Sequence, residues 1–552
     1  MKIKKYKELI LIIFLSFIIN FATLNTFPVL DRDEARYAQS TKQMLEINNY
    51  SSIKFQDELR SKKPIGIYWL QALSVNILSV KSDSIFSKNQ LNDIWKYRIV
   101  SSIFSLITCL VMYLVGSKIF DRKTSFFGTL ILQCTLLFTI ESHIAKTDAT
   151  LLTCSVISML ILFGYYKSIF VKKYDITFFI FWSTLGASIL LKGPIIPIMV
   201  LISIIFLIIF EKKARWLLNT NPLIGTIITI LIVLPWFLSL SGVEQNSFFN
   251  EGFKKDFLEK ILSVQEKHGA FPGSHTIAIF FLFFPMSIFL FPTILASVKS
   301  IKQENKLFLI AWIIPNLILL ELIPTKLPHY ALPLYPAISL LVAQYIVEKN
   351  KPIFNSYSIL NIFNYLLYLI IVFGICLLLF FSMKNYSTFY KNYSYLIIIF
   401  FLVLISSIII KLKFQIIKTL YYQVFLSCIT SIFIFGFFLS KLDKIWISKN
   451  LYNFIKAENI RLNSNDIASI GYNEPSLIFY LGTQINIIKS LNEDFFEKKL
   501  YKYIIIEEKY LTDFKTILES SNYEYFLQRN IGGFNMAKGR WVNTMIYKLK
   551  EK

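Results

Sequence analysis

The chain has 552 residues, of which 55% are hydrophobic and 16% aromatic, and its formal net charge at pH 7 is +23. A soluble protein of this length could not bury so many long apolar runs, so the composition excludes a soluble fold and indicates several membrane spans. The positive charge does not indicate a nucleic-acid partner. Residues 445–552 hold 15 Lys and Arg against 12 Asp and Glu, so most of the excess lies between the apolar runs, where basic residues orient membrane proteins.

The apolar segments predict an α-helical polytopic membrane protein. The first begins with MKIKKYK and has no small-residue cleavage site, so we expect a retained helix rather than a removed signal peptide. Several runs approach the ~20 apolar residues that a helix needs to cross the hydrocarbon core. We expect about thirteen transmembrane helices, at residues 8–27, 97–117, 124–141, 149–166, 176–191, 194–210, 223–241, 275–298, 307–323, 330–346, 358–382, 393–410 and 419–440.

One further apolar segment, residues 64–80, is predicted to lie along the bilayer. It is short and contains Gln71, Ser74 and Asn76, which suits an interfacial helix. The basic loops then all fall on one side of the membrane, which the positive-inside rule makes cytoplasmic. The amino terminus is therefore expected inside, and the exterior face is expected to carry residues 28–96, 142–148, 192–193, 242–274, 324–329 and the tail 445–552.

The pattern changes after residue 444. Alternating apolar stretches (DIASIGY, QINIIKS, KYIIIEE) are separated by helix-like runs such as YLTDFKTILESS. This order of elements predicts a small α/β domain. The chain is therefore expected to consist of a transmembrane domain, residues 1–444, and an exterior α/β domain, residues 445–552.

Charged residues gather directly after the first apolar segment, in DRDEARYAQS (residues 31–40). This stretch predicts a helix over the outer leaflet, capped by Asp31 with Glu34 three residues further on. In such a helix Asp33, Arg36 and Tyr37 share one face, because they are three and four residues apart. A carboxylate, a guanidinium group and a phenol then converge. The alternative is an amphipathic interfacial helix whose polar face is merely solvated.

Other exterior elements add polar side chains. ESHIAKTDAT places Asp148 at the mouth of a span, where an ionisable residue indicates function. Lys192, in LLKGPIIP, lies at an exterior turn, where snorkelling of its ammonium group is an equally good explanation. Two further loops, SVQEKHGAFPGSH and IPTKLPHYALPLYP, contribute the candidate substrate-binding residues Glu266, His268, Lys326, His329 and Tyr330.

These residue types suit chemistry on an anionic substrate. Lys and Arg can neutralise a departing phosphate, and Arg can grip it with two hydrogen bonds. An aspartate can take the proton from an attacking hydroxyl. All four histidines lie in exterior loops or at their edges: His143, His268, His275 and His329. The five cysteines fall in apolar segments, so neither a disulfide framework nor a Cys-type metal site is indicated.

Six motifs appear in the order of a known family. They are LDRDEARYA, KKPIGIYWLQA, AKTDATLL, LLKGP, QEKHGAFPG and PTKLPHYALPLYPA. Together they resemble the GT-C superfamily of membrane glycosyltransferases, in the branch that joins the protein O-mannosyltransferases and the lipid A aminoarabinose transferase (glycosyltransferase families 39 and 83). The similarity covers about residues 28–340, and SLIFYLG and MAKGRW in the tail also look like this group.

The resemblance implies an enzyme that takes a sugar from a polyprenyl-phosphate carrier on the outer face of the membrane. Such enzymes transfer the sugar, usually with inversion, to an acceptor hydroxyl or phosphate. The family's catalytic base corresponds to Asp33. Its other site residues correspond to Arg36, Tyr37, Lys63, Asp148 and Lys192. The resemblance implies that the cations among them hold the carrier phosphate.

The chain departs from this family at one position. A metal-binding glutamate of the aminoarabinose transferase corresponds here to Lys62, so an extra cation replaces an acidic ligand. A metal site of that kind is not expected, and the sugar need not be aminoarabinose. Glu266 and His268 form an E-x-H pair that could bind a divalent metal, but this spacing is a weak signal by itself.

The leading hypothesis is a polyprenyl-phosphate-sugar-dependent glycosyltransferase of the bacterial inner membrane. It would act on a lipid, glycan or protein acceptor, with a cytoplasmic amino terminus and a periplasmic carboxyl-terminal domain. One alternative is a transporter or flippase of a lipid-linked sugar, but internal repeats and mid-membrane charges are not evident. Another is a scaffold that recruits partners through its tail, which leaves the cluster of polar loops unexplained.

Overall fold

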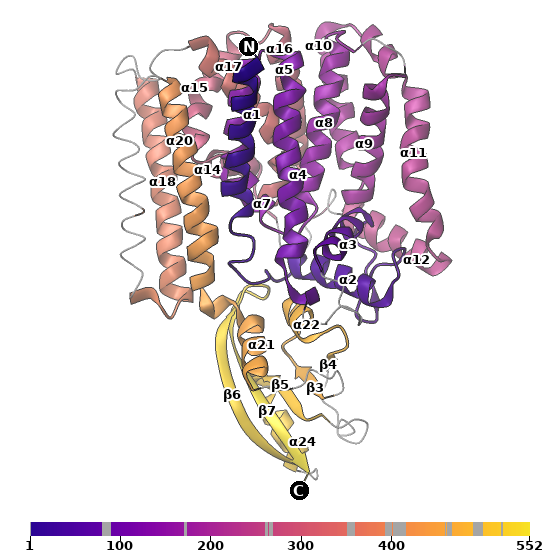
Figure 1. Cartoon of the computed structure of the whole chain (residues 1–552), viewed down its shortest axis with the longest axis vertical. Helices are drawn as coiled ribbons and strands as arrows, with labels where there is room; N and C mark the ends of the chain where they lie inside the picture. Colours follow the sequence, from indigo (N-terminus) through magenta and orange to yellow (C-terminus); the bar gives the residue numbers. More distant parts are fainter. Residues whose placement is uncertain are drawn as a thin grey trace.

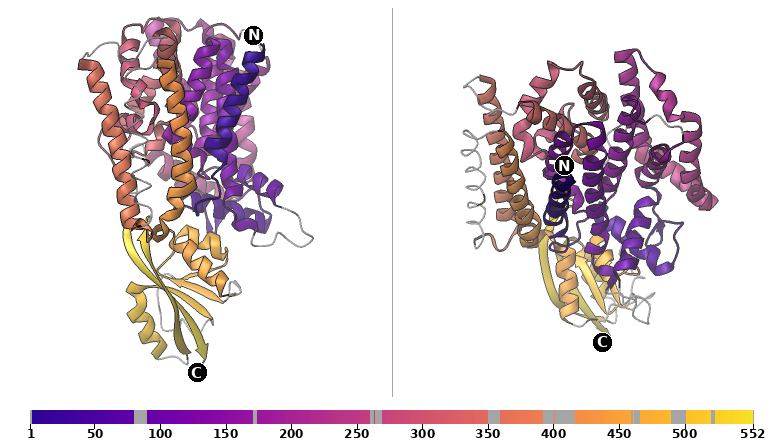
Figure 2. Two further views of the ribbon diagram at one scale, coloured as in Figure 1. Left: turned by 60° about the vertical axis from the view of Figure 1, so that its left-hand side comes forward. Right: turned by 45° about the horizontal axis from the view of Figure 1, so that its top comes forward.

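The computed structural model describes the chain apart from residues 1, 80–89, 171–173, 260–262, 264–268, 350–358, 392–399, 401–415, 459, 461–465, 489–500, 520–522 and 552. A bundle of helices forms one part, and a sheet with flanking helices lies at one end of it (Figure 1). The amino terminus lies at the opposite end of the bundle from this sheet (Figures 1 and 2).

Seven helices in the described residues are long and apolar enough to cross a membrane. A helix rises 1.5 Å per residue, so 18 to 20 residues span the ~30 Å hydrocarbon core. The continuous runs are α4 (Trp95–Leu114) with α5 (Gly116–Ile119), α8 (Asp148–Tyr166), α11 (Pro222–Ser239), α16 (Glu304–Leu322), η6 (Pro328–Leu334) with α17 (Tyr335–Lys349), α18 (Ile359–Tyr386), and α20 (Ile416–Ser431) with η8 (Ile432–Phe438) and η9 (Leu439–Lys441).

Two of the predicted spans, residues 124–141 and 275–298, are sharply bent. Helices α6 (Arg122–Gln133) and α7 (Leu136–Ser142) meet at 65°, and α14 (Ser274–Leu282) meets η5 (Met286–Phe289) and α15 (Leu290–Val298) at 114°. Pro285 cannot donate a backbone hydrogen bond, so a helix breaks there. The two breaks lie next to each other. The Leu136 N–H at one break donates to the Phe284 carbonyl at the other, at 2.8 Å, so each of these backbone groups has a hydrogen-bond partner.

The remaining apolar helices of the bundle are shorter or lie partly outside the described residues. The first predicted span corresponds to α1 (Lys2–Ser16) and η1 (Phe17–Phe21), and the span at 393–410 lies almost wholly outside the described residues. The exact number of spans therefore stays a prediction. The other helices of the bundle are α9 (Ile176–Lys192), α10 (Ile195–Glu211), η3 (Arg215–Thr220), α12 (Gly242–Ser247) and η4 (Phe248–Glu259).

Two short helices lie where the bundle meets the sheet (Figure 1). They are α2 (Asp33–Ile47) and α3 (Gly66–Leu78), joined by the hairpin β1 (Lys54–Phe55) and β2 (Glu58–Leu59), with η2 (Gln90–Asn92) following α3. At 13 residues, α3 is about 20 Å long, too short to cross the core. It corresponds to the segment predicted to lie along the bilayer.

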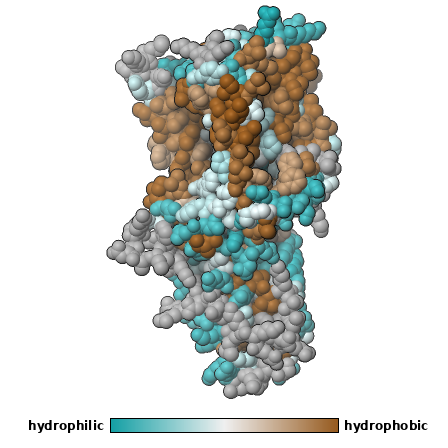
Figure 3. All heavy atoms as spheres, turned by 90° about the vertical axis from the view of Figure 1, so that its right-hand side faces the viewer, coloured by the Kyte–Doolittle hydropathy of each residue, from teal (hydrophilic) through white to brown (hydrophobic). Residues whose placement is uncertain are grey.

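The described surface matches a protein in a membrane. On the face shown in Figure 3, apolar side chains cover the sides of the bundle, and hydrophilic ones gather at its ends and over the sheet. Leu223, Leu231 and Leu238, on α11, are more than 60% exposed, which is expected of a helix against lipid.

The carboxyl-terminal residues form an α/β unit, as the sequence predicts. Its sheet has the order β4-β3-β5-β7-β6, in which β3 pairs in parallel with β4 and β5, whereas β7 pairs antiparallel with β5 and β6. Its helix α22 lies beside α2 (Figure 1). The elements of this C-terminal unit are η10 (Asp443–Ile445), α21 (Ile447–Ala457), β3 (Ile467–Ile470), α22 (Pro475–Leu481), β4 (Asn486–Ile488), β5 (Tyr503–Glu507), η11 (Glu508–Tyr510), α24 (Leu511–Glu519), β6 (Tyr523–Asn535) and β7 (Arg540–Glu551).

Candidate active site

A small polar cavity of about 100 Å³ lies at the end of the bundle nearest the C-terminal unit. It is formed by the start of α2, the segment before α3, the start of α8, the end of α9 and the loop before η6. Most of the residues that the sequence predicted for the site are brought together here. The charged and aromatic residues that line it are Arg32, Asp33, Arg36, Tyr37, Arg60, Lys62, Lys63, Lys146, Asp148, Lys192, His329 and Tyr330.

Asp33 is the first residue of α2 and faces this cavity. Its side chain is 58% exposed, and its ion pair with Arg36, one turn along the helix, is long at 4.0 Å. Burial within the recess alone would raise the pKa of the Asp33 carboxyl. The cations around it, led by Lys146 and Arg60, outweigh burial and hold this pKa below its usual range. Asp33 is therefore ionised at neutral pH.

Two tyrosines and an arginine form the wall beside Asp33. The Tyr37 and Tyr68 rings lie 5.5 Å apart, and the Arg60 guanidinium group lies over the Tyr37 ring at 5.4 Å. Arg60 Nε donates to the Tyr68 hydroxyl at 3.0 Å. The hairpin β1–β2 places Arg60, whose backbone N–H donates to the Ile53 carbonyl at 2.8 Å. Tyr37 is 3% exposed and acts chiefly as a packing surface for this guanidinium group.

The expected cap at the start of α2 is wrong. The residue before the helix is Arg32, which makes no side-chain cap, and Asp31 instead accepts a hydrogen bond from the Ser476 backbone N–H of α22 at 3.0 Å. Glu34 points into the protein and pairs with Arg98 through two hydrogen bonds of 2.8 Å. The side chains of Asp31 and Glu34 therefore bond Ser476 and Arg98, which lie far along the chain, instead of forming a local capping box.

The buried Glu34–Arg98 pair joins the site to the bundle. Glu34 also accepts hydrogen bonds from the backbone N–H groups of Leu30 and Ala145, at 2.8 and 2.9 Å. Arg98 Nη1 donates to the carbonyls of Leu24 and Phe27. Leu30 lies just before Asp33 at the start of α2, and Ala145 lies just before Lys146, ahead of the start of α8. By bonding both backbone segments, Glu34 fixes the distance between these two walls of the cavity.

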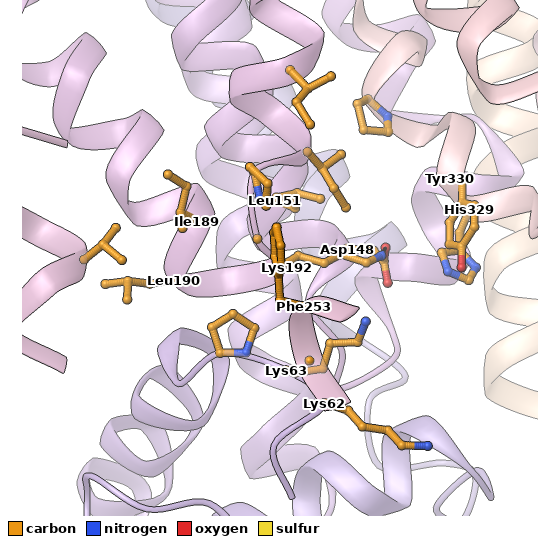
Figure 4. A pocket seen from close by; sticks show the side chains of 18 of the residues that line it. Lys62, Lys63, Asp148, Leu151, Ile189, Leu190, Lys192, Phe253, His329 and Tyr330 are labelled. Atoms are coloured by element: carbon orange, nitrogen blue, oxygen red, sulfur yellow. Dashed lines mark hydrogen bonds and ion pairs between the residues drawn. The ribbon is translucent and has the colours of Figure 1, made fainter. Parts of the chain in front are cut away.

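Asp148 and Lys192 form the ion pair at the centre of Figure 4, where their side chains point toward one another. The carboxylate Oδ1 and the ammonium Nζ are 2.5 Å apart, and Lys146 adds a second, longer ion pair of 3.7 Å to the same aspartate. Both residues of the central pair are at least 90% buried. Lys192 is the last residue of α9, and its Nζ also lies 5.4 Å from the Tyr330 ring, so it does not snorkel into solvent.

A larger apolar cavity of about 480 Å³ adjoins the polar one. Its walls come mainly from aliphatic and aromatic residues of α8, α9, α10, α11, η4 and α16. Figure 4 shows Leu151 of α8 and Ile189 and Leu190 of α9 among them. The two cavities share the side chains of Lys62, Lys63, Asp148, Lys192, His329 and Tyr330. A long apolar chain with an anionic head could therefore place its head among the cations and its chain in the larger cavity.

Some predicted residues lie elsewhere. Lys326 donates to the Glu321 carbonyl at 2.9 Å and so caps the end of α16 instead of lining the cavity. His143, which was not among the predicted site residues, stacks on Phe435 with the ring centroids 4.0 Å apart and forms a hydrogen bond with Thr23. Glu266 and His268 lie outside the described residues.

The residues around Asp33 do not fit a divalent metal. In the part of the chain that the structure describes, no three His, Cys, Asp or Glu side chains form a group suited to a metal. The donor set beside Asp33 is dominated by Arg60, Lys62 and Lys63, whose positive charges would repel a cation.

Sequence reasoning missed three residues of this region: Arg60, Lys146 and Arg98. Arg60 belongs to the run RSKK in a predicted exterior loop, and Lys146 lies two residues before Asp148, but no local spacing relates either residue to Asp33. Arg98 had the strongest signal, because an arginine within an apolar span is costly unless a partner compensates it.

Comparisons with known proteins agree with this architecture. A family model described as dolichyl-phosphate-mannose-protein mannosyltransferase matches residues 62–238. An undecaprenyl phosphate-alpha-4-amino-4-deoxy-L-arabinose arabinosyl transferase of Wigglesworthia glossinidia brevipalpis is 26% identical, over 84% of this chain and 81% of that protein. A second transferase of this name, from Proteus mirabilis, is 24% identical over 59% of this chain, which spans only 57% of that protein's length.

Solved structures match over almost the whole chain. ArnT from Cupriavidus metallidurans bound to undecaprenyl phosphate has a TM-score of 0.74 at 14% identity, covering 97% of both chains. The archaeal oligosaccharyltransferase AglB from Archaeoglobus fulgidus has a TM-score of 0.54 at 12% identity, covering all of this chain and 74% of its own. The fold is that of the GT-C membrane glycosyltransferases. The resemblance predicted from the motifs is confirmed, and within this class the chain is similar to the aminoarabinose transferases.

Proposed function

We propose that the protein is a glycosyltransferase that takes a sugar from a polyprenyl-phosphate carrier and transfers it to an acceptor on a lipid, a glycan or a protein. The junction of the two cavities supports this proposal most directly. An apolar cavity of about 480 Å³ opens onto a cluster of cations beside the exposed carboxylate of Asp33. This arrangement suits a lipid-linked anion as donor.

The donor phosphate is placed beside Lys63 and Lys192, where the two cavities meet. Arg60 and Arg36 complete the positive surface on the side of α2. These fixed charges stabilise the negative charge that develops on the phosphate as the sugar leaves. The isoprenoid chain occupies the apolar cavity.

Asp33 acts as the general base in this scheme. It takes the proton of the acceptor hydroxyl while the hydroxyl oxygen bonds to the anomeric carbon of the sugar. The bond from that carbon to the phosphate oxygen breaks, and its electron pair stays on polyprenyl phosphate. A single displacement of this kind inverts the anomeric configuration. Where the acceptor is an ionised phosphate, no proton has to be removed and a base is not required.

The low pKa of Asp33 leads to a prediction about pH. A carboxylate with a depressed pKa is a weak base, but a bound donor phosphate offsets the cations that depress it, so donor binding raises the pKa. Activity is lost as pH falls and Asp33 is protonated. The acid limb of kcat/KM, which reports the free enzyme, is therefore expected at lower pH than the acid limb of kcat. Full pH profiles test this, and coincident limbs would contradict it.

The apolar cavity gives a second prediction. Leu320→Trp fills part of this cavity and is expected to weaken binding of undecaprenyl phosphate by roughly 10- to 30-fold, since each CH₂ group kept from apolar contact costs ~0.8 kcal/mol. Leu322→Trp, on the same helix but 74% exposed, is the matched control and should bind normally. Titration with undecaprenyl phosphate and with a short-chain phosphate measures both. If Leu320→Trp weakened the binding of both ligands equally, the isoprenoid chain would not occupy this cavity.

The arrangement in the membrane is part of the same proposal. Residues 1–444 form the transmembrane transferase domain of an inner-membrane protein, and residues 445–552 form an exterior, periplasmic α/β domain. The amino terminus is cytoplasmic, and the cavity opens on the exterior face. The amino terminus lies at the end of the bundle opposite the C-terminal unit, which supports placing the two on opposite sides of the membrane (Figure 1).

A flippase of a lipid-linked sugar remains the second candidate, because the same two cavities could hold the carrier during transport. Lipid that copurifies with the protein, identified by mass spectrometry, tests the shared requirement for a polyprenyl phosphate ligand. Vesicles with purified protein and a labelled carrier then separate the two functions. Transfer of the label to an acceptor supports the transferase, whereas movement of the intact carrier across the bilayer without transfer would refute it.

A further inference from the structure

Helix α2 has two polar faces with different partners. Asp33, Arg36 and Tyr37 line the polar cavity, whereas residues 39, 42 and 46 follow at helical spacing on the opposite side. On that side, Gln39 Nε2 donates to Thr483 Oγ1 at 2.7 Å, and Lys42 Nζ donates to the Phe479 carbonyl at 2.9 Å. The catalytic helix is therefore held between the cavity and the C-terminal unit.

The segment that leads into Asp33 is also bound by the C-terminal unit. The Val29 N–H donates to the Tyr480 hydroxyl at 3.1 Å, and Asp31 Oδ1 accepts from the Ser476 N–H at 3.0 Å. The Arg32 guanidinium group donates to the Ala537 carbonyl at the tip of the β6–β7 hairpin. Arg32 has a φ of 66°, a left-handed value that a non-glycine residue keeps only when its surroundings enforce it.

The contacts with α22 lie near both of its ends. Asp31 Oδ1 accepts from the Ser476 N–H near the start of α22, and the Lys42 ammonium group donates to the Phe479 carbonyl near its end. The hairpin tip is braced against the same region, because Asn535 Nδ2 donates to Glu474 Oε1 at 2.8 Å. Lys538 Nζ donates to Asn473 Oδ1 at 2.9 Å. The hairpin, α22 and the start of α2 thus form one connected structure.

We propose that the C-terminal unit is a positioning element for catalysis. Its docking through α22 and the hairpin tip fixes residues 29–32 and thereby the place of the Asp33 carboxylate, with Asp31 and Arg32 as positioning residues. The inference rests on the role of Asp33 in the proposed function. Since Lys63 and Lys192 belong to other elements, loss of this docking is expected to lower kcat and leave donor binding intact.

Asp31 gives the docking a dependence on pH. Burial raises the pKa of the Asp31 carboxyl to about 7, with Glu474 raising it further, while the Ser476 hydrogen bonds and Arg36 lower it. Tyr472 and Tyr480 also face this carboxyl from the C-terminal unit. When undocked, an aspartate in water has a pKa near 3.8. The docked state then binds more protons between about pH 4 and 7, so docking weakens as pH rises through that window and is level above it.

The experiment uses the full-length protein, three test variants and one control variant. Asp31→Ala removes the acceptor for the Ser476 N–H, whereas Asp31→Asn keeps an acceptor oxygen and removes the titration. Asn535→Ala acts from the hairpin, distant in sequence from α2. Lys502→Ala, which breaks a surface ion pair with Asp466 inside the C-terminal unit, is the matched control. The readouts are kcat, KM for the donor, and amide hydrogen exchange of residues 30–37.

Asp31→Ala is expected to lower kcat by about 10- to 100-fold, because small misplacements of a catalytic group are costly. The KM for the donor should change by less than about threefold, and exchange in residues 30–37 should be faster for both Asp31→Ala and Asn535→Ala. Asp31→Asn should restore kcat. Once the intrinsic base catalysis of amide exchange is divided out, it should also abolish the pH dependence of the protection of residues 30–37 between pH 5 and 7.

Unchanged exchange in residues 30–37 in both Asp31→Ala and Asn535→Ala would overturn the inference. So would a loss in Asp31→Ala confined to KM. A wild-type protein that transfers no sugar would refute the proposed function, and the exchange measurement would still decide whether the C-terminal unit holds the start of α2.

Discussion

Asp33→Asn is expected to lower kcat by about 10²- to 10⁴-fold, the usual contribution of a general base. Asparagine has nearly the same shape as aspartate but cannot accept the proton. The substitution also removes a negative charge from among Lys146, Arg60 and Lys63, so the anionic donor should bind as tightly as before or more tightly. Turnover and the affinity for undecaprenyl phosphate are measured on the same purified protein.

The matched control is Asp57→Asn, an exposed aspartate in the turn between β1 and β2, outside the polar cavity. It should change neither turnover nor affinity. Normal turnover in Asp33→Asn would remove Asp33 from the mechanism, and loss of donor binding in that variant would indicate a binding role instead.

Arg98→Met is expected to destabilise the fold by about 3–5 kcal/mol, because it leaves the buried Glu34 charge without its partner. Arg98 is fully buried, and Glu34 is 1% exposed. The variant also frees the carbonyls of Leu24 and Phe27, which Arg98 bonds in the native protein. Thermal unfolding in detergent should show a lower midpoint, with lower yield of folded protein.

The double variant Arg98→Met with Glu34→Gln separates charge from packing. Glutamine is neutral and keeps an oxygen for the N–H of Leu30 or Ala145, so the double variant should be more stable than Arg98→Met alone. If the single variant unfolds like the wild type, the Glu34–Arg98 pair does not hold the cavity together.

The sequence predicts much of the site because its elements obey local rules. Asp33, Arg36 and Tyr37 share a face through helical spacing, and Asp148 and Lys192 stand at helix ends, so one topology brings both ends to the same cavity. The fold class follows from the apolar runs and the motif order, and the solved structures agree with it.

The rest depends on contacts that no local pattern encodes. Asp31 and Glu34 fit a capping box, but their partners are Ser476 and Arg98, which lie far along the chain. The bend near Pro285 had a visible signal, whereas the bend before Leu136 had none of that kind. Local spacing predicted which face of α2 carries the candidate site residues, and tertiary packing decided what holds its other face.

The most direct test of the account is a single-turnover reaction with a polyprenyl-phosphate-linked sugar labelled in the sugar. Purified wild-type protein, reconstituted with an acceptor lipid, is predicted to release one polyprenyl phosphate for each glycosylated acceptor, with inverted anomeric configuration, and Asp33→Asn is predicted to release almost none. Retained configuration, or equal release by both proteins, would contradict a direct displacement assisted by Asp33.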